Sequence, residues 1–516
     1  MDTNSKTMRL IVIITGLLLS TITYGQTSLN EIGLEAGKYK VGFKHYTVSD
    51  STRNYRIHNE YNNQLIERPI SISVWYPAKI EDSNSEQLTV LNYVEIFKEE
   101  EEWKNLPDYF LMDWFQHLPN TPQNKAHLSE KVNAFSNPTF SDSNFPVVVY
   151  APSYQASSIE NFALFEYLAS NGFVVISSPS RGTETRWLEG ATTKDMETQS
   201  RDVEFLLKEI NNYKNIDSEK VALMGFSFGG LSNAITVMKN KNISAVVSLD
   251  GADRYNYPVL EKSPYFDLDK FTIPYIHFAQ KEIPKEVLTT DKIPEELNYN
   301  FKLYDSLKYS NIYRYKFHDL THSYFSSFGV LFANRDKRQD KSDEKIMASY
   351  NLLCQHTLQF LNAILKNDKK AIAFIENKPV SNGFSETLIS KQTKNALQRD
   401  FTYKDFNDLA FKQDYQDLIP LYKKTIVNHP NLELQEGMLN MLGLRLSFNP
   451  KKKEKGYNVI LLALHIYPKS ANLYDSLAEA YFYNKDYQKA ILNYKKSLEL
   501  NPKNQNAIDR LEQLKK

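Results

Sequence analysis

The sequence predicts an α/β region, built on a mostly parallel sheet with helices on both faces, followed by an all-α region. Between residues 146 and 365, short apolar runs of strand length alternate with segments whose apolar residues recur at helical spacing. Strands that are apolar throughout are typical of parallel sheets covered on both faces. After about residue 366 the strand signal stops and only helical patterns follow.

The predicted strands begin before the regular pattern, at residues 39–47 and 69–77. The first partly alternates, which indicates an edge strand, and the second ends at a proline. The later strands are expected at residues 147–150, 173–176, 221–224, 243–249, 273–278 and 312–317. A helix over residues 161–170 ends at an Asn-Gly pair, which is a common stop signal. An amphipathic helix over residues 347–365 is expected to close this region.

Residues 80–143 interrupt the regular pattern and are interpreted as an insertion. The acidic run at residues 99–102 predicts a solvated helix face. The aromatic cluster at residues 109–115 has two interpretations, a lid over an apolar site or a helix packed on the main core.

The C-terminal region carries a repeat signal. Its residues at tetratricopeptide spacing are Tyr474, Leu477, Ala478, Tyr481, Ala490, Tyr494, Ser497 and Pro502. Small residues at such positions let two helices cross closely, aromatic residues fill the holes, and proline ends the unit. We therefore predict an α/β domain at residues 26–366, a linker at 367–400 and a helical domain at 401–516. The clearest repeat is expected at 471–504, with degenerate units before it.

The N-terminus has the features of a secretory signal peptide, predicted to span residues 1–25. Lys6 and Arg9 precede a short apolar segment at residues 10–19, and small residues follow it. Export to the periplasm or the extracellular space is therefore expected, with no stable membrane span after cleavage. Export permits disulfides, but Cys354 is the only cysteine, so no intramolecular disulfide can form. Its position in a helical apolar stripe predicts a buried structural thiol.

Overall charge gives no reason to expect a nucleic-acid partner. Lys plus Arg and Asp plus Glu each number 62, so the formal net charge is zero. Aromatic residues make up 13% of the chain, which argues against disorder.

The segment Gly225-Phe226-Ser227-Phe228-Gly229 reads G-x-S-x-G. An apolar strand pattern precedes it and a helical pattern follows it, which is the context of a nucleophile elbow in the α/β-hydrolase fold. Such a turn is too tight for side chains at its flanking positions and exposes the central hydroxyl. Ser227 is therefore the candidate nucleophile.

A serine hydroxyl needs an imidazole to take its proton, and that imidazole needs a carboxylate to orient it. In this fold the chain order is serine, acid, histidine. Asp250 directly follows the strand after the elbow helix and is the preferred acid. Asp253 and Glu282, close to the ends of this strand and the next, are the alternatives.

The candidate base is His322, which lies in a loop shortly after the last strand. His318 is closer to that strand and is expected to be structural. His356 lies in the closing helix, and His277 lies inside a strand, where a satisfied core histidine is the ordinary interpretation.

The oxyanion hole needs backbone N–H donors. One is expected from Phe228, the residue after the nucleophile. The other is expected from the loop that follows residues 147–150. Pro152 has no N–H, so Ser153 or Tyr154 is the expected donor, with Tyr154 preferred.

These segments resemble the α/β-hydrolases related to platelet-activating factor acetylhydrolase and the serine members of the dienelactone hydrolase group. The resemblance covers about residues 35–366. Its motifs are Ile72-Ser73-Val74-Trp75-Tyr76-Pro77-Ala78, Gly225-Phe226-Ser227-Phe228-Gly229-Gly230, Leu249-Asp250-Gly251 and Thr321-His322-Ser323-Tyr324-Phe325. Pro152-Ser153 stands where the family commonly has His-Gly. The resemblance implies hydrolysis of short or oxidised acyl esters, including phospholipid acetyl groups.

The sequence thus predicts an exported serine esterase that uses Ser227, His322 and Asp250, without a metal or an organic cofactor. A small-molecule or lipid ester is the expected substrate, and the helical domain is expected to bind a protein partner. One alternative is a serine peptidase or amidase with the same triad. Another is an interaction scaffold whose hydrolase domain is degenerate.

Overall fold

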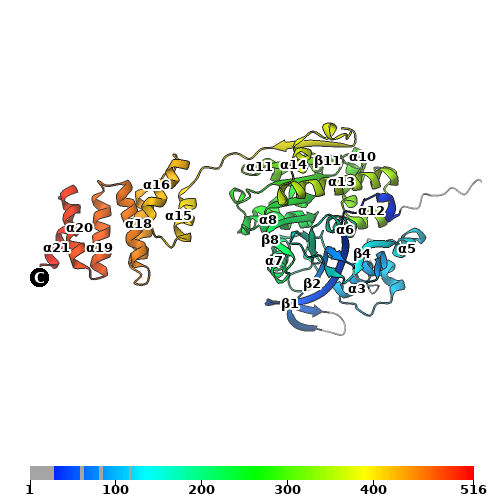
Figure 1. The fold of residues 1–516 in the computed structure, drawn as a ribbon, viewed down its shortest axis with the longest axis horizontal. Coiled ribbons are helices and arrows are strands. Elements are labelled where there is room, and N and C mark those ends of the chain that lie inside the picture. Colours follow the sequence, from blue (N-terminus) through cyan, green and yellow to red (C-terminus); the bar gives the residue numbers. More distant parts are fainter. Residues whose placement is uncertain (1–27, 59–62, 81–84, 115–117, 516) are drawn as a thin grey trace, which may run out of the picture. The chain divides into compact units, whose positions relative to one another are not determined.

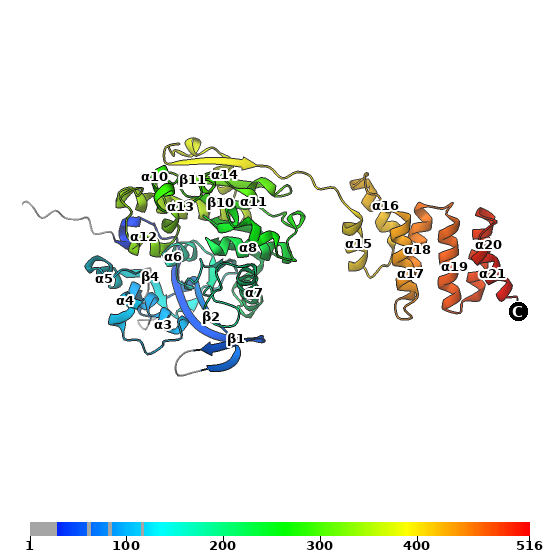
Figure 2. The same cartoon turned by 180° about the vertical axis from the view of Figure 1, so that it is seen from behind.

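The computed structural model describes residues 28–58, 63–80, 85–114 and 118–515. The chain divides into two compact units, Met1–Leu397 and Gln398–Lys516. Figures 1 and 2 show the sheet-containing first unit and the helical second unit. The predicted signal peptide, residues 1–25, lies outside the described residues. Within the described part of the chain, no helix has the length and apolar character to cross a membrane.

The first unit is built around one twelve-stranded sheet in the order β12-β11-β10-β9-β8-β6-β7-β2-β1-β4-β3, with β5 paired to β2. The strands are β1 (Lys40–His58), β2 (Asn63–Lys79), β3 (Gln87–Thr89), β4 (Lys131–Ser136), β5 (Thr139–Phe140), β6 (Phe145–Ala151), β7 (Val174–Ser177), β8 (Ile216–Phe226), β9 (Ala245–Leu249), β10 (Tyr275–Ala279), β11 (Ile312–Phe317) and β12 (Ile389–Lys394). Every neighbouring pair from β11 to β7 is parallel. The mostly parallel α/β-hydrolase-like fold is therefore confirmed.

Helices cover both faces of this sheet, and strand β6 shows why its sequence is apolar throughout. Val148 and Tyr150 belong to the core under α6 (Phe162–Ser170) and α13 (Asp343–Leu365). Val147 and Val149 belong to the core under α7 (Thr193–Glu209) and α8 (Phe228–Lys239). Alternate side chains point to opposite faces of a strand, so both faces must be apolar when both are covered.

Shorter helices complete the first unit. They are η1 (Leu29–Ile32), α2 (Val90–Val94), α3 (Ile96–Glu100), η2 (Asp108–Phe110), α4 (Leu111–Trp114), α5 (Pro122–Leu128), η3 (Ile210–Asn212), η4 (Ala252–Arg254), α9 (Tyr257–Glu261), η5 (Leu268–Lys270), α10 (Lys285–Thr290), η6 (Glu295–Asn298), α11 (Lys302–Ser306), η7 (His322–Phe325), α12 (Ser327–Phe332), α14 (Lys369–Glu376) and η8 (Pro379–Asn382).

The predicted insertion, residues 80–143, is part of the sheet rather than a separate excursion. Its strands β3 and β4 extend the sheet beyond β1. The expectation of a solvated acidic face is wrong for two members of the run. Glu100 is buried and accepts hydrogen bonds from the Ser157 hydroxyl and the Ser158 N–H. Glu101 pairs with Arg181 and with Arg186. The lid remains a prediction.

The predicted linker at residues 367–400 is wrong for most of its length. Helix α14 buries Ala371 and Ile375 in the core of the first unit. Strand β12 pairs antiparallel with β11 and forms one edge of the sheet. An edge strand packs few of its side chains, and of the segment Ile-Ser-Lys-Gln-Thr-Lys only Ile389 is buried. Its polar sequence therefore carries no apolar strand signal.

The second unit consists of α15 (Tyr403–Lys412), α16 (Leu418–Asn428), α17 (Glu436–Ser447), α18 (Lys453–Ile466), α19 (Ala471–Tyr483), α20 (Tyr487–Leu500) and α21 (Gln505–Gln513). Pairs of neighbouring helices form hairpins with one shared core. The small residue Ala490 and the aromatic Tyr494, both from the predicted repeat, are fully buried between helices. These contacts explain the repeat spacing read from the sequence.

Candidate active site

Ser227 lies at a sharp turn between β8 and α8. Its backbone angles are φ 51° and ψ −116°, a conformation that a residue with a side chain rarely adopts. Its N–H donates to the Leu249 carbonyl at 3.1 Å. A Cβ on Gly229 would lie 1.9 Å from the Ala151 carbonyl oxygen, so this close approach of α8 to β6 requires glycine. The turn therefore has the geometry expected of a nucleophile elbow.

The structure brings Ser227, His322 and Asp250 together. His322 Nε2 lies 3.0 Å from Ser227 Oγ, and His322 Nδ1 lies 2.6 Å from Asp250 Oδ2. With Nδ1 protonated, the imidazole donates to the carboxylate and Nε2 is left to accept the serine proton. This geometry can activate the serine hydroxyl as a nucleophile.

Asp250 is fully buried at the end of β9. Burial would raise the pKa of its carboxyl. The Arg254 guanidinium at 3.4 Å, the hydrogen bond with His322 and the Gln280 N–H at 3.0 Å outweigh burial and hold the pKa well below its usual range. The carboxylate therefore stays ionised opposite the imidazole.

Two further residues join the site without having been predicted. The Gln280 N–H donates to Asp250, and its side-chain oxygen accepts from the His322 N–H at 3.1 Å, so this residue connects the acid and the base. The only sequence signal for it is its place directly after β10. Burial and the nearby Asp250 charge raise the pKa of the second residue, Tyr255, to about 12.

The alternative acids lie in other surroundings. Glu282 is exposed and pairs with Lys316 at 2.8 Å. Asp253 is buried in a separate cluster, where it accepts from the hydroxyls of Ser248 and Tyr275. The structure brings neither of them to His322.

The other histidines also have structural surroundings. His318 Nε2 lies 3.1 Å from the Ser390 hydroxyl on β12. His356 is buried in α13, where burial lowers its pKa to about 4. His277 is buried on β10 with its Nδ1 2.9 Å from the Tyr275 hydroxyl. The cysteine of α13 is buried too. Burial raises the pKa of the Cys354 thiol, which keeps it protonated and suits a structural role.

The loop after β6 faces the cleft that contains Ser227. Among the described residues, the N–H groups of Phe228 and Tyr154 have no acceptor, whereas the Ser153 N–H donates to Glu160 at 2.9 Å. Of the two candidate donors on this loop, Tyr154 is thus the one left available to a ligand. Its ring packs edge-on against Phe228, with centroids 5.8 Å apart.

The cleft beside Ser227 has a volume of about 390 Å³. Its apolar wall is formed by Phe97, Leu118, Pro119, Phe226, Phe328 and Ala333. Three of these come from the insertion at residues 80–143. The Phe226 ring lies 4.9 Å from the His322 ring, so it also supports the base. The cleft can hold an apolar group next to the nucleophile.

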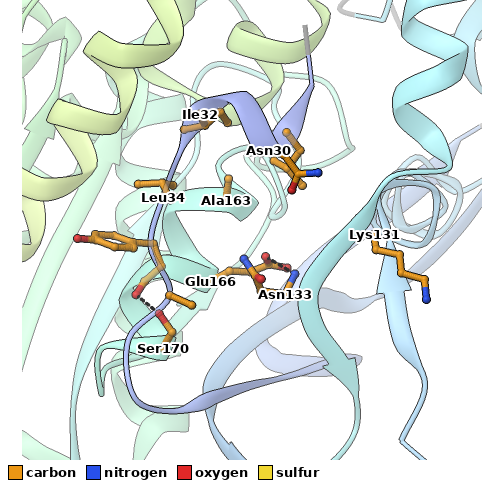
Figure 3. Close-up of a pocket in the computed structure, with 11 residues that line it drawn as sticks. Asn30, Ile32, Leu34, Lys131, Asn133, Ala163, Glu166 and Ser170 are labelled. Carbon is orange, nitrogen blue, oxygen red and sulfur yellow. Dashed lines mark hydrogen bonds between the residues drawn. The ribbon is translucent and has the colours of Figure 1, made fainter.

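A second, smaller cavity of about 110 Å³ lies under the N-terminal segment at residues 29–36 (Figure 3). Glu166 of α6 lines it and accepts from the Asn133 N–H at 2.9 Å, and burial raises its pKa to about 7. No triad residue lines this cavity. Within the described ranges, no group of His, Cys, Asp and Glu is placed to hold a metal ion.

Two family models match the chain. The tetratricopeptide repeat model matches residues 476–504, and the prolyl oligopeptidase family model matches residues 160–254, which include Ser227 and Asp250. Among solved structures, the chain is similar to ferulic acid esterase from Streptomyces cinnamoneus, with 13% identity and a TM-score of 0.48. That similarity covers 70% of this chain and 98% of the esterase chain. No curated protein matches.

The fold and the site together define a serine hydrolase with an α/β-hydrolase fold. A C-terminal tetratricopeptide region follows it. Both esterases and peptidases use this type of site.

Proposed function

We propose that this chain is an exported serine esterase that hydrolyses short-chain acyl esters, with phospholipid acetyl esters as one candidate substrate. The observation that carries the proposal is the hydrogen-bonded series Ser227–His322–Asp250 at the edge of a cleft with an apolar wall. Such a wall suits an acyl chain, because burial of apolar surface favours binding.

In this mechanism Ser227 Oγ attacks the acyl carbonyl while His322 Nε2 takes its proton. Asp250 keeps the imidazole oriented and stabilises its positive charge. The N–H groups of Phe228 and Tyr154 would stabilise the oxyanion. His322 then returns the proton to the leaving alkoxide, and water activated by His322 hydrolyses the acyl-enzyme.

The rival function is cleavage of a peptide or another amide by the same residues. The match of residues 160–254 to the prolyl oligopeptidase family supports this rival. The resemblance to the acetylhydrolase group, through Leu249-Asp250-Gly251 and Thr321-His322-Ser323-Tyr324-Phe325, supports the esterase. We favour the esterase because these motifs surround the acid and the base.

The test compares p-nitrophenyl esters with p-nitroanilides of the same acyl groups, from acetyl to octanoyl, with an acetylated phospholipid added. We expect turnover of esters, strongest for short chains, and little or none of the anilides. Ser227→Ala should remove both turnover and labelling by a fluorophosphonate probe. Preference for anilides would establish the peptidase. Absence of turnover and of labelling in the wild type would favour the scaffold interpretation.

Two further parts of the proposal concern the ends of the chain. The basic and apolar pattern of residues 1–25 supports export to the periplasm or the extracellular space. The helical unit is proposed to bind a protein partner, because stacked helix hairpins present extended surfaces. Fractionation of cells that express the full chain tests the first statement.

A further inference from the structure

A buried carboxylate, Glu160, lies in the wall of the cleft that contains Ser227. The residue precedes α6 and is only 6% exposed. Its carboxylate accepts from the Ser153 N–H at 2.9 Å, from the Ser153 hydroxyl and from the Tyr150 hydroxyl at 3.0 Å. The Glu160 side chain therefore holds both the N–H and the hydroxyl of Ser153.

Ser153 is joined by a peptide bond to Tyr154, whose N–H is free to face a ligand. Fixing the N–H and the hydroxyl of Ser153 restricts both its backbone and its side chain. The preceding residue is also held, because the Pro152 carbonyl accepts from Gln199 Nε2 at 2.8 Å. Gln155, which follows Tyr154, is held as well, since its Oε1 accepts from the Leu188 N–H at 2.9 Å. Tyr154 therefore lies in a loop that is anchored on both sides.

We propose that Glu160 is a positioning residue for the oxyanion hole, which holds Ser153 so that the Tyr154 N–H is in place before the substrate binds. This inference rests on the proposed serine hydrolase activity. A preorganised donor stabilises the transition state because it needs no rearrangement when the charge develops. Glu160 makes no hydrogen bond to the nucleophile or the base, and its hydrogen bonds connect it to the site through the loop. Burial raises the pKa of its carboxyl to about 7, while the hydrogen bonds from Ser153 and Tyr150 and the charge of the nearby His322 lower it.

Glu160→Gln tests the proposal in the full chain. Glutamine has nearly the same shape, but its amide group cannot accept the bonds that two carboxylate oxygens accept. We expect kcat for a short ester to fall about 10- to 100-fold, since a small misplacement of a catalytic group costs about that much. KM should stay within about threefold. The inhibition constant of a trifluoromethyl ketone, which forms a tetrahedral adduct, should rise in proportion to the loss in kcat/KM.

Glu166→Gln is the matched control. Glu166 lies in α6, the helix that follows Glu160, and is also buried. Its carboxylate accepts from the Tyr93 hydroxyl at 2.7 Å. It also accepts from the Asn133 N–H (Figure 3). It lines the second cavity and not the cleft. We expect Glu166→Gln to lower the melting temperature as much as Glu160→Gln while kcat stays within about twofold.

Ser153→Ala keeps the inference testable if Glu160→Gln does not fold. It removes only the hydroxyl bond, and we expect a smaller loss in kcat, of about 3- to 10-fold, again with KM unchanged. In the double variant the two losses should not multiply, because both act on one loop. A Glu160→Gln enzyme with wild-type kcat would overturn the inference. A wild type without ester or amide turnover would instead overturn the proposed function.

Discussion

At the scale of the residue, the site depends on how Asp250 and Ser227 are held. Asp250 has φ 41° and Ser227 has φ 51°, both in a region that favours glycine. Hydrogen bonds compensate for these conformations, since the Asp250 N–H donates to the Phe278 carbonyl at 2.7 Å and the Ser227 carbonyl accepts from the Ala252 N–H at 2.7 Å. Both side chains are therefore presented at the same edge of the sheet by strained but well-bonded turns.

Asp250→Asn should lower ester turnover by about three to four orders of magnitude, because the imidazole loses the charge that orients it. The substitution also leaves the buried Arg254 without its opposite charge, so we expect the melting temperature to fall by several degrees. Steady-state kinetics well below the melting temperature separate the two effects. As the control, Glu282→Gln removes an exposed carboxylate and should stay within about tenfold of wild type at an unchanged melting temperature. The reverse order of losses would place the acid at Glu282.

At the scale of the element, close helix contacts decide where small residues are required. In the second unit α17 and α18 approach at Gly443 and Gly456. A Cβ on Gly456 would lie 2.3 Å from the Ser447 backbone nitrogen and 2.6 Å from the Gly443 carbonyl oxygen. Backbone atoms cannot move aside as a flexible side chain can, so this contact excludes a side chain.

Gly456→Ala should therefore destabilise the helical unit, by about 1–3 kcal/mol, the usual range for an overpacked contact. Thermal unfolding of the full chain followed by far-ultraviolet circular dichroism should show an earlier loss of helical signal. Turnover of short esters should be unchanged at moderate temperature. Gly437→Ala, in α17 but with nothing within 4 Å of the added Cβ, should not destabilise it. Equal effects of the two substitutions would contradict the close contact.

At the scale of the whole molecule, the α/β-hydrolase unit extends past the boundary that its sequence indicates. The segment after α13 returns to the sheet, where β12 covers the edge of β11. It also surrounds the buried His356 ring with Phe374 and Phe384, at centroid distances of 5.0 and 5.3 Å. Helix α14 and strand β12 thus belong to the hydrolase unit and not to a connection.

A chain that ends at Leu397 should keep ester turnover within about twofold of the full chain, since it retains the whole sheet. A chain that ends at Lys369 removes α14 and β12, which exposes core side chains and an unpaired strand edge. We expect this shorter chain to be poorly soluble or to melt at a clearly lower temperature. Calorimetry and activity on the two purified chains provide the measurement. If the chain that ends at Lys369 kept full activity and the same melting temperature, the domain boundary predicted at residue 366 would be correct. If the chain that ends at Leu397 folded but were inactive, the helical repeats would form part of the site.

Features that depend on local chemistry can be predicted from the amino-acid sequence. Apolar runs of strand length predict buried parallel strands, because both faces of such strands must be covered. The G-x-S-x-G segment predicts the elbow, because only glycine permits its close backbone contacts. The chain order then limits the acid to Asp250, Asp253 or Glu282, with Asp250 preferred, and indicates His322 as the base. The tetratricopeptide spacing likewise follows from small residues where helices cross.

Contacts between segments far apart in the chain become visible in the folded structure alone. The folded structure shows that Asp250, and not Glu282, reaches His322. Each of these residues follows one of two neighbouring parallel strands, and their local sequences do not show which of them contacts the base. The structure placed the polar strand β12 at the sheet edge, where no apolar pattern is needed. It also showed that Glu160 and Gln280 support the site. Single polar residues outside a motif carry no periodic signal, and their partners are set by how the chain packs.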